Sequence, residues 1–214
     1  MKKMKLTIEQ KQSLEKRIAL LEKNTSGELV VYIAKNSDDY RMSSWKAAMI
    51  VSFLVVVTLF IPDMIWSSYS IPGIIKLPII FSTSLAAFGL AYFFDFIRLY
   101  LTPKDIIEER LFTKAHDVFL QQEVFATKHR IGILFYISHL EKQVTVLSDS
   151  GIYSRVEPES WDEIISTIIG GIKNNTSYEG IYEAINTCEY LLKENHFYPE
   201  KGQENELKDT VIME

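Results

Sequence analysis

Three carboxylates at the ends of apolar segments are the residues of this sequence best suited to chemistry. Asp149 follows the apolar segment 143–148, and Asp38 and Asp39 follow the apolar segment 29–34. Open α/β sheets tend to bind ligands beyond the carboxyl ends of their strands, and converging carboxylates would hold a hard cation such as Ca²⁺ or Mg²⁺. Because such a cation polarises a phosphoryl oxygen and activates water, one hypothesis is a metal-dependent phosphatase of low specificity. A calcium-binding regulatory domain without turnover is another.

A purely structural alternative exists for each of these acids. Asp149 precedes Ser150 and Gly151, and Asp and Gly are favoured in turns for local hydrogen bonding and for backbone with positive φ. Asp38 and Asp39 lie just before a long apolar segment, where the charges of a solvated linker are expected. The sequence leaves both interpretations open, and with them the questions of catalysis and of metal binding.

No complete catalytic motif accompanies the acids in the sequence. Cys188 is followed by Glu189 and Tyr190 rather than by the glycine-rich loop and arginine of a cysteine phosphatase, and there is no P-loop or dinucleotide fingerprint. The four histidines lack the spacing of a zinc site, and a single cysteine cannot form an intrachain disulfide. A net charge of −5 without a cluster of Lys and Arg argues against nucleic-acid binding.

Two long apolar segments interrupt an otherwise charged sequence. The uncharged runs 47–62 and 77–94 extend through aromatic ends to 45–66 and 77–100. Because a helix needs roughly 20 apolar residues to cross the hydrocarbon core, we predict transmembrane helices at 45–66 and 77–100. The alternative is two core helices of a soluble protein, but a domain this small would scarcely cover helices that are apolar all round. The short segment 67–76 makes a hairpin, so both flanking regions lie on one side of a lipid bilayer.

Basic residues near the ends of the hairpin predict its orientation. Lys76 lies in the connecting segment, and Asp95, near the inner end of the second span, has Arg98 three residues on as a partner. The basic residues on the domain side are more numerous: Lys35, Arg41, Lys46, Arg98, Lys104 and Arg110. By the positive-inside rule the soluble part faces the cytoplasm, so we predict a multi-pass protein of the inner (cytoplasmic) membrane.

The remaining residues predict one α/β domain that is discontinuous in sequence, at 1–40 and 102–197. The segment 29–34 is apolar at every position, which is typical of a strand buried on both faces, and its partner strands must follow the hairpin. Segments 131–138 and 143–148 fit that role. The other predicted helices are one capped by Thr7 with Gln10 and three that begin near Lys104, Pro158 and Ser177. The last of these turns Cys188 toward the core. We also predict a short strand at 152–156 and a flexible polar tail at 198–214.

Five short motifs occur in order along the soluble part. They are TSGEL at 25–29, HRIGILF at 129–135, VTVLSDSGI at 144–152, VEPESWD at 156–162 and NEL at 205–207. Together with two membrane spans inserted after the first strand, they resemble a membrane-anchored branch of the TPM domain family, which occurs in bacterial membrane proteins and photosystem II repair proteins. The resemblance implies a three-layer α/β/α sandwich around a small mixed sheet. It marks Gly27, Glu28, Gly132 and Gly151 as motif positions.

The resemblance alone does not decide the activity. Some members of the family are described as phosphatases and others as non-catalytic accessory proteins of membrane complexes, and a shared fold does not transfer a function without a site. Given the anchor and the incomplete catalytic set, we predict a non-catalytic accessory or interaction module of a membrane complex. Its expected partners are the lipid bilayer and another membrane protein.

Overall fold

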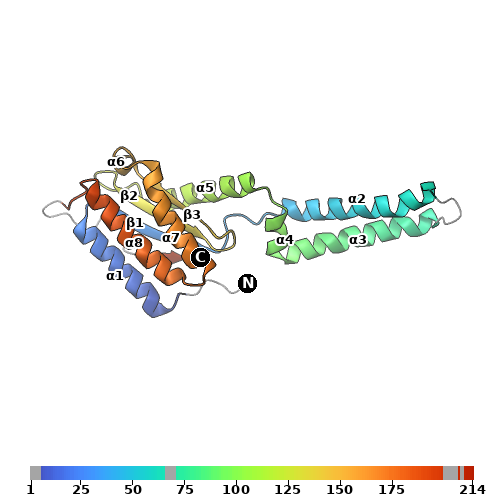
Figure 1. Ribbon diagram of the computed structural model, residues 1–214, viewed down its shortest axis with the longest axis horizontal. Coiled ribbons are helices and arrows are strands. Elements are labelled where there is room, and N and C mark those ends of the chain that lie inside the picture. Colours follow the sequence, from blue (N-terminus) through green and yellow to red (C-terminus); the bar gives the residue numbers. More distant parts are fainter. Residues whose placement is uncertain (1–5, 66–70, 200–206, 208–209) are drawn as a thin grey trace. The chain divides into compact units, whose positions relative to one another are not determined.

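β1 (Glu28–Ala34) lies inside a four-stranded sheet, as its apolar sequence predicts. The strand order is β3-β2-β1-β4 (Figure 1). β2 (Gly132–Ser138) and β4 (Val211–Met213) both pair with β1 in parallel, whereas β3 (Gln143–Ser148) pairs with β2 in the antiparallel direction. Every residue of β1 and β2 is buried, so this mixed sheet is covered on both faces.

The chain divides into two compact units. The residues described by the computed structural model are 6–65, 71–199, 207 and 210–214. The α/β unit comprises Met1–Ser37 and Glu108–Glu214, and the hairpin unit comprises Asp38–Ile107. The hairpin unit is therefore an insertion, in the sequence, between β1 and the other strands of the sheet.

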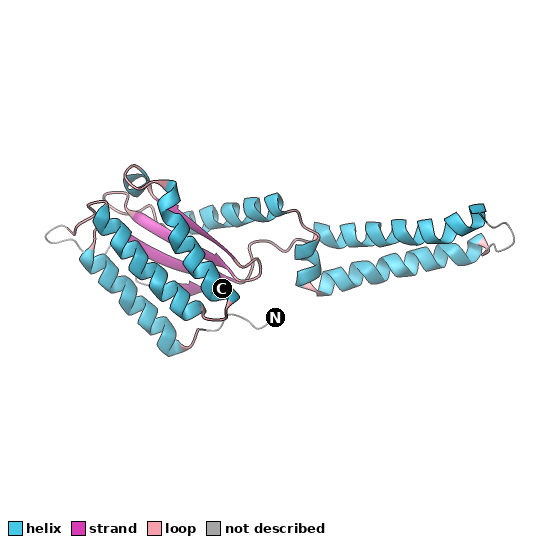
Figure 2. Cartoon of the chain, in the orientation of Figure 1, coloured by secondary structure: helices cyan, strands magenta, loops and turns pink. Residues whose placement is uncertain are grey.

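Helices cover both faces of the sheet and complete an α/β/α sandwich. α1 (Ile8–Asn24), α7 (Asp162–Lys173) and α8 (Ser177–Glu194) cover one face, and α5 (Lys104–Gln121) covers the other (Figure 2). Because side chains alternate along a strand, β1 contributes to two cores. Leu29, Val31 and Ile33 join the first core, and Val30, Tyr32 and Ala34 join the second. The predicted fold class is confirmed.

Two local predictions are also confirmed. Thr7 and Gln10 form a reciprocal capping box, in which each side chain accepts a hydrogen bond from the other residue's backbone N–H. Cys188 is fully buried in the core between the sheet and its helices. Burial raises the pKa of the Cys188 thiol well above its ordinary value, so the thiol is an apolar packing group rather than a nucleophile.

A partly buried ion pair joins the first and last long helices of the α/β unit. Arg17 of α1 donates to Glu189 of α8 and also to Asn186 Oδ1 at 2.6 Å. Glu189 accepts further hydrogen bonds from Asn24 and Lys193. Burial by itself would raise the pKa of Glu189, but these donors outweigh it and hold the pKa below its ordinary value of 4.5.

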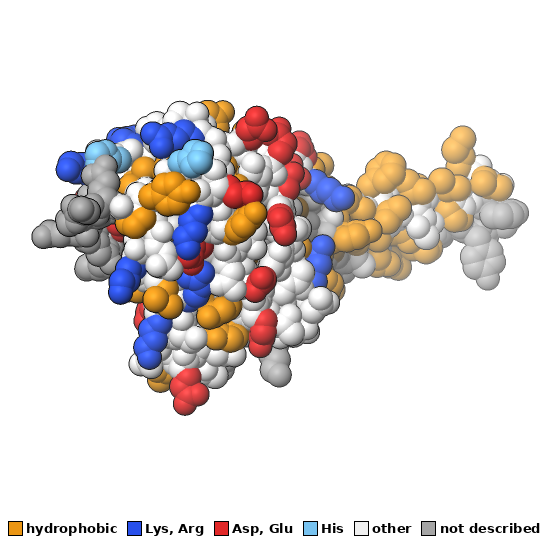
Figure 3. All heavy atoms as spheres, turned by 60° about the vertical axis from the view of Figure 1, so that its left-hand side comes forward, with side chains coloured by type: hydrophobic (Ala, Val, Ile, Leu, Met, Phe, Trp, Pro, Cys, Tyr) orange, Lys and Arg blue, Asp and Glu red, His pale blue; other side chains and the backbone are white. Residues whose placement is uncertain are grey.

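The two apolar segments form helices whose surfaces are not buried in protein. α2 (Met42–Ile65) and α3 (Gly73–Phe93) pack against each other as a hairpin, and each is long and apolar enough to cross a membrane. In their most apolar 18-residue stretches, 0% of α2 and 17% of α3 is buried. Figure 3 shows hydrophobic side chains along the face of the hairpin that is in view. Core helices of a soluble protein are mostly buried, and these two helices are not.

The second apolar segment is not one continuous helix to residue 100, and this prediction was wrong. The helix breaks at Phe94, whose backbone is extended (φ −113°, ψ 100°), and a short helix α4 (Asp95–Tyr100) follows. Asp95 occupies the first turn of α4, where a carboxylate is favoured by the helix dipole. Its predicted pairing with Arg98 is present.

Lys76 lies inside α3 rather than in the connecting segment where the sequence placed it. Its ammonium group pairs with Asp63 of α2 and lies 4.4 Å from the centre of the Phe60 ring. The side chain of Lys76 is 4% exposed. The buried ammonium group needs a counter-charge because a lone charge is costly to desolvate, and the partly exposed Asp63 provides it. This pair therefore fixes α2 and α3 against each other.

Two further predictions for the α/β unit were wrong. The expected strand at 152–156 is instead a short helix, α6 (Ser150–Tyr153), because Asp149 begins a helical turn. The tail at 198–214 is not polar and flexible throughout, since β4 returns to pair with β1 and Val211 is fully buried. Its apolar Val-Ile-Met sequence provides the side chains that β1 requires on that edge. Residues 205 and 206 of the last motif lie outside the described residues.

A glycine substitution tests the close packing at the start of β2. A Cβ at Gly132 would lie 1.9 Å from the backbone oxygen of Val124, whereas a Cβ at Gly170 of α7 has open space. We expect Gly132→Ala to lower the free energy of unfolding by about 3 kcal/mol or more, since backbone must shift. Gly170→Ala is the matched control, and we expect it to raise stability by about 0.5–1 kcal/mol. Thermal unfolding of the full chain in detergent, followed by circular dichroism, measures both; equal stability of the two variants would contradict the structure.

The Arg17–Glu189 pair makes stability depend on acid pH. Because the pKa of Glu189 is lowered on folding, its stabilisation is present at neutral pH and is lost as the pH falls below about 4.5 and through the folded pKa. Glu189→Gln should cost about 1.5–3 kcal/mol at pH 7, because Arg17 loses hydrogen bonds to a charged acceptor. That difference from the natural chain should shrink as the pH falls from 4.5 through the lowered pKa of Glu189. Glu183→Gln, on the exposed side of α8, should change stability by less than about 0.5 kcal/mol at either pH; a pH-independent loss for Glu189→Gln would contradict the assignment.

Candidate functional site

Asp149 lies at the junction of β3 and α6, where neighbouring groups engage its carboxylate. The residue is 5% exposed. Its Oδ1 accepts a hydrogen bond from the backbone N–H of Ser150 at 2.6 Å, and its Oδ2 lies 2.8 Å from Nε of Arg130. Arg130 itself has a φ of 56° and lies over the Phe125 ring, 5.9 Å from its centre. Asp149 therefore ends β3 and begins α6, which is the structural alternative for this residue.

The direction of the strands separates Asp149 from the carboxyl end of β1. The backbone N–H of Asp149 donates to the carbonyl of Gly132 at 2.9 Å, and Gly132 pairs with Glu28 at the start of β1. The chain leaves β1 at the other end, where the N–H of Ser37 donates to Glu141 Oε1 at 2.8 Å. A strand of this length spans about 20 Å. Asp149 and the exit of β1 are therefore at opposite ends of the sheet.

Asp38 and Asp39 follow the exit of β1 in the sequence, and their convergence with Asp149 stays a hypothesis of the sequence. Both belong to the hairpin unit. Asp38 accepts a hydrogen bond from the N–H of Asp39, whose carboxylate pairs with Arg41 at 3.1 Å. The side chains of Asp39 and Arg41 are largely exposed. These contacts are those of solvated charges in a linker, as the second interpretation of the sequence expected.

The motif glycines gather at the sheet end that holds Asp149, and close packing requires them there. Gly132 opens β2 and approaches the backbone oxygen of Val124 too closely for any side chain. A Cβ at Gly151 of α6 would lie 2.4 Å from the backbone oxygen of His129. The N–H of Gly151 also donates to the carbonyl of Arg130 at 2.9 Å. These glycines hold the loop before β2 against the start of α6.

The motif residues of β1 lie at the same end. Gly27 precedes the strand and its N–H donates to Thr25 Oγ1 at 3.3 Å. Glu28 is 1% exposed and accepts a hydrogen bond from the backbone N–H of Leu207 at 3.2 Å. A buried carboxylate needs such donors. The end of the sheet marked by these motifs is thus a corner where several chain segments are bonded together.

We name this end of the sheet the Asp149 corner; it comprises Glu28, Arg130, Gly132, Asp149 and Gly151. The Asp149 corner does not present a set of metal ligands. Among the described residues, no three or more His, Cys, Asp or Glu side chains come together so that they could hold a metal ion. The Asp149 oxygens already face an N–H group and a guanidinium group. Sequence reasoning missed the pairing of Arg130 with Asp149, because the two residues meet only through the turn of the chain between β2 and β3.

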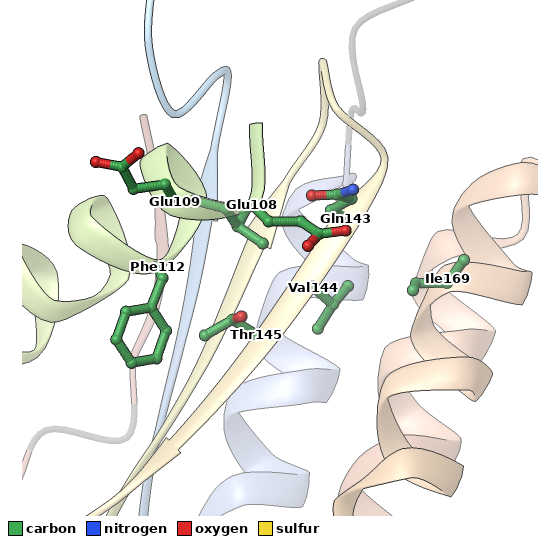
Figure 4. Close-up of a pocket in the computed structure, with 8 residues that line it drawn as sticks. Glu108, Glu109, Phe112, Gln143, Val144, Thr145 and Ile169 are labelled. Carbon is green, nitrogen blue, oxygen red and sulfur yellow. The ribbon is translucent and has the colours of Figure 1, made fainter. Parts of the chain in front are cut away.

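A groove of about 580 Å³ runs along the outer edge of β3, away from the Asp149 corner (Figure 4). It lies between α5 and α7, and β3 forms its floor. Its lining residues are Glu108, Glu109, Leu111, Phe112, Gln143, Val144, Thr145 and Ile169. The lining includes two carboxylates and no Lys or Arg. Nothing in the sequence predicted this groove, because its walls come from three elements that are distant along the chain.

The fold and the Asp149 corner define a small α/β/α sandwich domain whose motif residues are used for packing. A family model described as the TPM domain matches residues 99–190, so this part of the chain is similar to the TPM domain family. The matched part includes the motifs at 129–135, 144–152 and 156–162, and it does not include the motif at 25–29.

A solved structure has the same fold. The NMR structure of BA42 protein from the psychrophilic bacterium Bizionia argentinensis aligns with a TM-score of 0.59 over 98% of this chain and 95% of that chain, at 20% sequence identity. Identity at this level shows the fold alone. Among curated proteins, none matches the chain.

Substitutions at Asp149 distinguish a structural role from a catalytic one. Asp149→Ala should lower the free energy of unfolding by about 0.5–2 kcal/mol, because the N–H of Ser150 loses its acceptor. Asp149→Asn keeps an acceptor oxygen and should lose less. Glu159→Ala, at an exposed acid of η1 (Pro158–Trp161), is the control and should be near neutral. Turnover of a generic phosphoester by the full chain that disappears in Asp149→Asn would instead restore the phosphatase hypothesis.

Proposed function

We propose that this protein is a membrane-anchored TPM-domain protein that acts as a non-catalytic accessory or interaction module of a membrane complex. The observation that carries the proposal is the pair of apolar helices α2 and α3, whose surfaces have almost no protein cover. Exposed apolar surface of this extent is stable in lipid and costly in water. A bilayer is therefore the environment that suits the hairpin unit.

The position of the insertion supports an anchoring role. The hairpin unit leaves the α/β unit after Ser37 and returns at Glu108, so both ends of the hairpin lead into one domain. A short hairpin brings its two ends back to the same side of the membrane. The α/β unit is thereby tied to the bilayer at two points of its chain, which limits its tumbling and keeps it at the membrane surface, where partners in the membrane are at high local concentration.

The proposed orientation places the α/β unit in the cytoplasm, on the inner membrane. Its support is the excess of basic residues on the domain side of the hairpin. The pairing of Lys76 with Asp63 adds to this, because the basic residue near the turn of the hairpin is held within the helices. The Lys76 charge is therefore poorly placed to act as a cytoplasmic anchor.

We propose a non-catalytic role because the residues of the Asp149 corner are used for packing and internal hydrogen bonds. Its acids and glycines are occupied by backbone N–H groups, a guanidinium group and close backbone contacts. An active site needs groups that are free to meet a substrate. A folded domain whose motif positions are used for packing, attached to a membrane anchor, is better suited to holding a partner.

Cysteine labelling tests the anchor and its orientation. In a Cys188→Ala background, single cysteines at Ile71 and at Glu179 report the hairpin turn and the exposed surface of α8. In intact cells, a membrane-impermeant maleimide should label Ile71→Cys and should leave Glu179→Cys unlabelled until the cells are opened. The reverse pattern would contradict the orientation. Recovery of the full chain in the aqueous fraction, monodisperse without detergent, would contradict the anchor.

Affinity purification tests the accessory role. The tagged full chain, extracted from membranes in a mild detergent, should carry a membrane protein in stoichiometric amount. The Gly170→Ala variant, in which the added Cβ has open space, is expected to keep the fold and is the positive control for the tag and the extraction. Purification of the natural chain without a stoichiometric membrane partner would contradict the role as an accessory module.

A further inference from the structure

The outer edge of β3 has a row of backbone groups that no described strand uses. β3 is the last strand of the sheet on its side. The bond from Asp149 N–H to Gly132 continues the antiparallel register, in which Ser148 lies opposite Ile133. Residues of an antiparallel strand alternate between those bonded to the neighbour and those pointing away. Val144, Val146 and Ser148 therefore direct their N–H and C=O groups outward.

This edge lacks the features with which proteins usually protect exposed strands. Natural edges are kept short, or carry Lys, Pro or a bulge that prevents pairing. The other edge strand, β4, has three residues. β3 has six residues, Gln-Val-Thr-Val-Leu-Ser, with no charge and no proline, in regular register with β2. Its edge is suited to accept another strand.

The groove over this edge has the form and the charge to receive an extended segment. An added strand would lie between Phe112 on the α5 wall and Ile169 on the α7 wall. Phe112 is 52% exposed, so the α5 wall offers apolar surface to a side chain. Gln143 Oε1 is buried and has no hydrogen-bond partner among the described residues. A donor group carried by the occupant would satisfy it.

We propose that this groove, named here the β3 groove, binds an extended segment of a partner protein that carries basic residues and adds as a strand to β3. The carboxylates of Glu108 and Glu109 line it on the α5 side, both residues are exposed, and no lining residue is basic (Figure 4). Lysine or arginine side chains of the incoming strand would meet these acids, and its backbone would bond to Val144 and Val146. The proposal rests on the function proposed above and states how the partner is held.

A second copy of this chain fits the edge less well. Two copies that paired through β3 would be related by a two-fold axis perpendicular to the joined sheet. The α5 helices of both copies would then lie on the same face, next to each other across the axis. Glu108 and Glu109 of one copy would approach the same acids of the other, and like charges in such a position oppose association.

Peptide binding to the full chain in a neutral detergent tests the proposal. The probe is a fluorescent eight-residue peptide of alternating Lys and Val, followed by fluorescence anisotropy, with empty micelles as the blank. A peptide of alternating Glu and Val is the charge control and should bind at least about tenfold more weakly. The double variant Glu108→Gln/Glu109→Gln should weaken the Lys-Val peptide by about three- to tenfold, as expected for two exposed charge pairs.

Blocking the edge distinguishes strand addition from simple charge attraction. Val146→Pro removes an outward N–H that the sheet itself does not use, and it should abolish binding, whereas Val146→Thr keeps the N–H and should bind as the natural chain does. A Lys-Val peptide methylated on alternate amide nitrogens provides the same test without changing the protein, and it should not bind. If Val146→Pro does not fold, the methylated peptide alone distinguishes strand addition from charge attraction.

Three results would overturn the proposal. The first is that the Lys-Val peptide does not bind above the blank, and the second is that the methylated peptide binds equally well. The third is that the natural chain forms a dimer that Val146→Pro separates, because this would assign the edge to a second copy. These outcomes are independent of the cysteine labelling and membrane fractionation. If the peptide does not bind but the chain is found in the membrane, the β3 groove proposal fails and the anchoring function stands. If the peptide binds but the chain is found in the aqueous fraction, only the anchor is removed.

Discussion

The parallel pairing of β1 with β2 holds the α/β unit together across the inserted hairpin. Seven residue pairs join these strands, from Glu28↔Gly132 to Ala34↔Ser138. β1 is buried on both faces and lies between β2 and β4, and both of these follow the insertion in the sequence. Because loop-closure entropy grows only slowly with loop length, an insertion as long as the hairpin unit is tolerated at the end of β1. The core on each side of the sheet depends on this pairing.

The same pairing explains why the motif residues lie where they do. The starts of β1 and β2 are adjacent, and the loop before β2 and the beginning of α6 must fit closely against them. Glycines, a buried glutamate and the Asp149–Arg130 pair meet these packing demands. The motif residues of this corner therefore have a structural task in the packing of the domain.

Much of the fold could be predicted from the sequence because its signals are local. The apolar run of β1, the capping box at Thr7 and the apolar faces of α7 and α8 each arise within a few turns or one strand. β4, the pairing of Lys76 with Asp63 and the break at Phe94 could not be predicted, since each depends on a partner elsewhere in the chain or on packing between helices. For the candidate site, Asp149 could be located at the end of β3 from its position in the sequence, but its pairing with Arg130 could not, because strand direction decides which loop ends meet.

The insertion also has a consequence for the order in which the protein can be made. A ribosome completes β1, then the whole hairpin unit, and only afterwards β2, which at about 5–20 residues per second is a delay on the order of ten seconds. During that interval the nascent Leu-Val-Val-Tyr-Ile-Ala strand has no partner strand. A chaperone that shields β1 during the wait would therefore raise the yield of correctly folded protein.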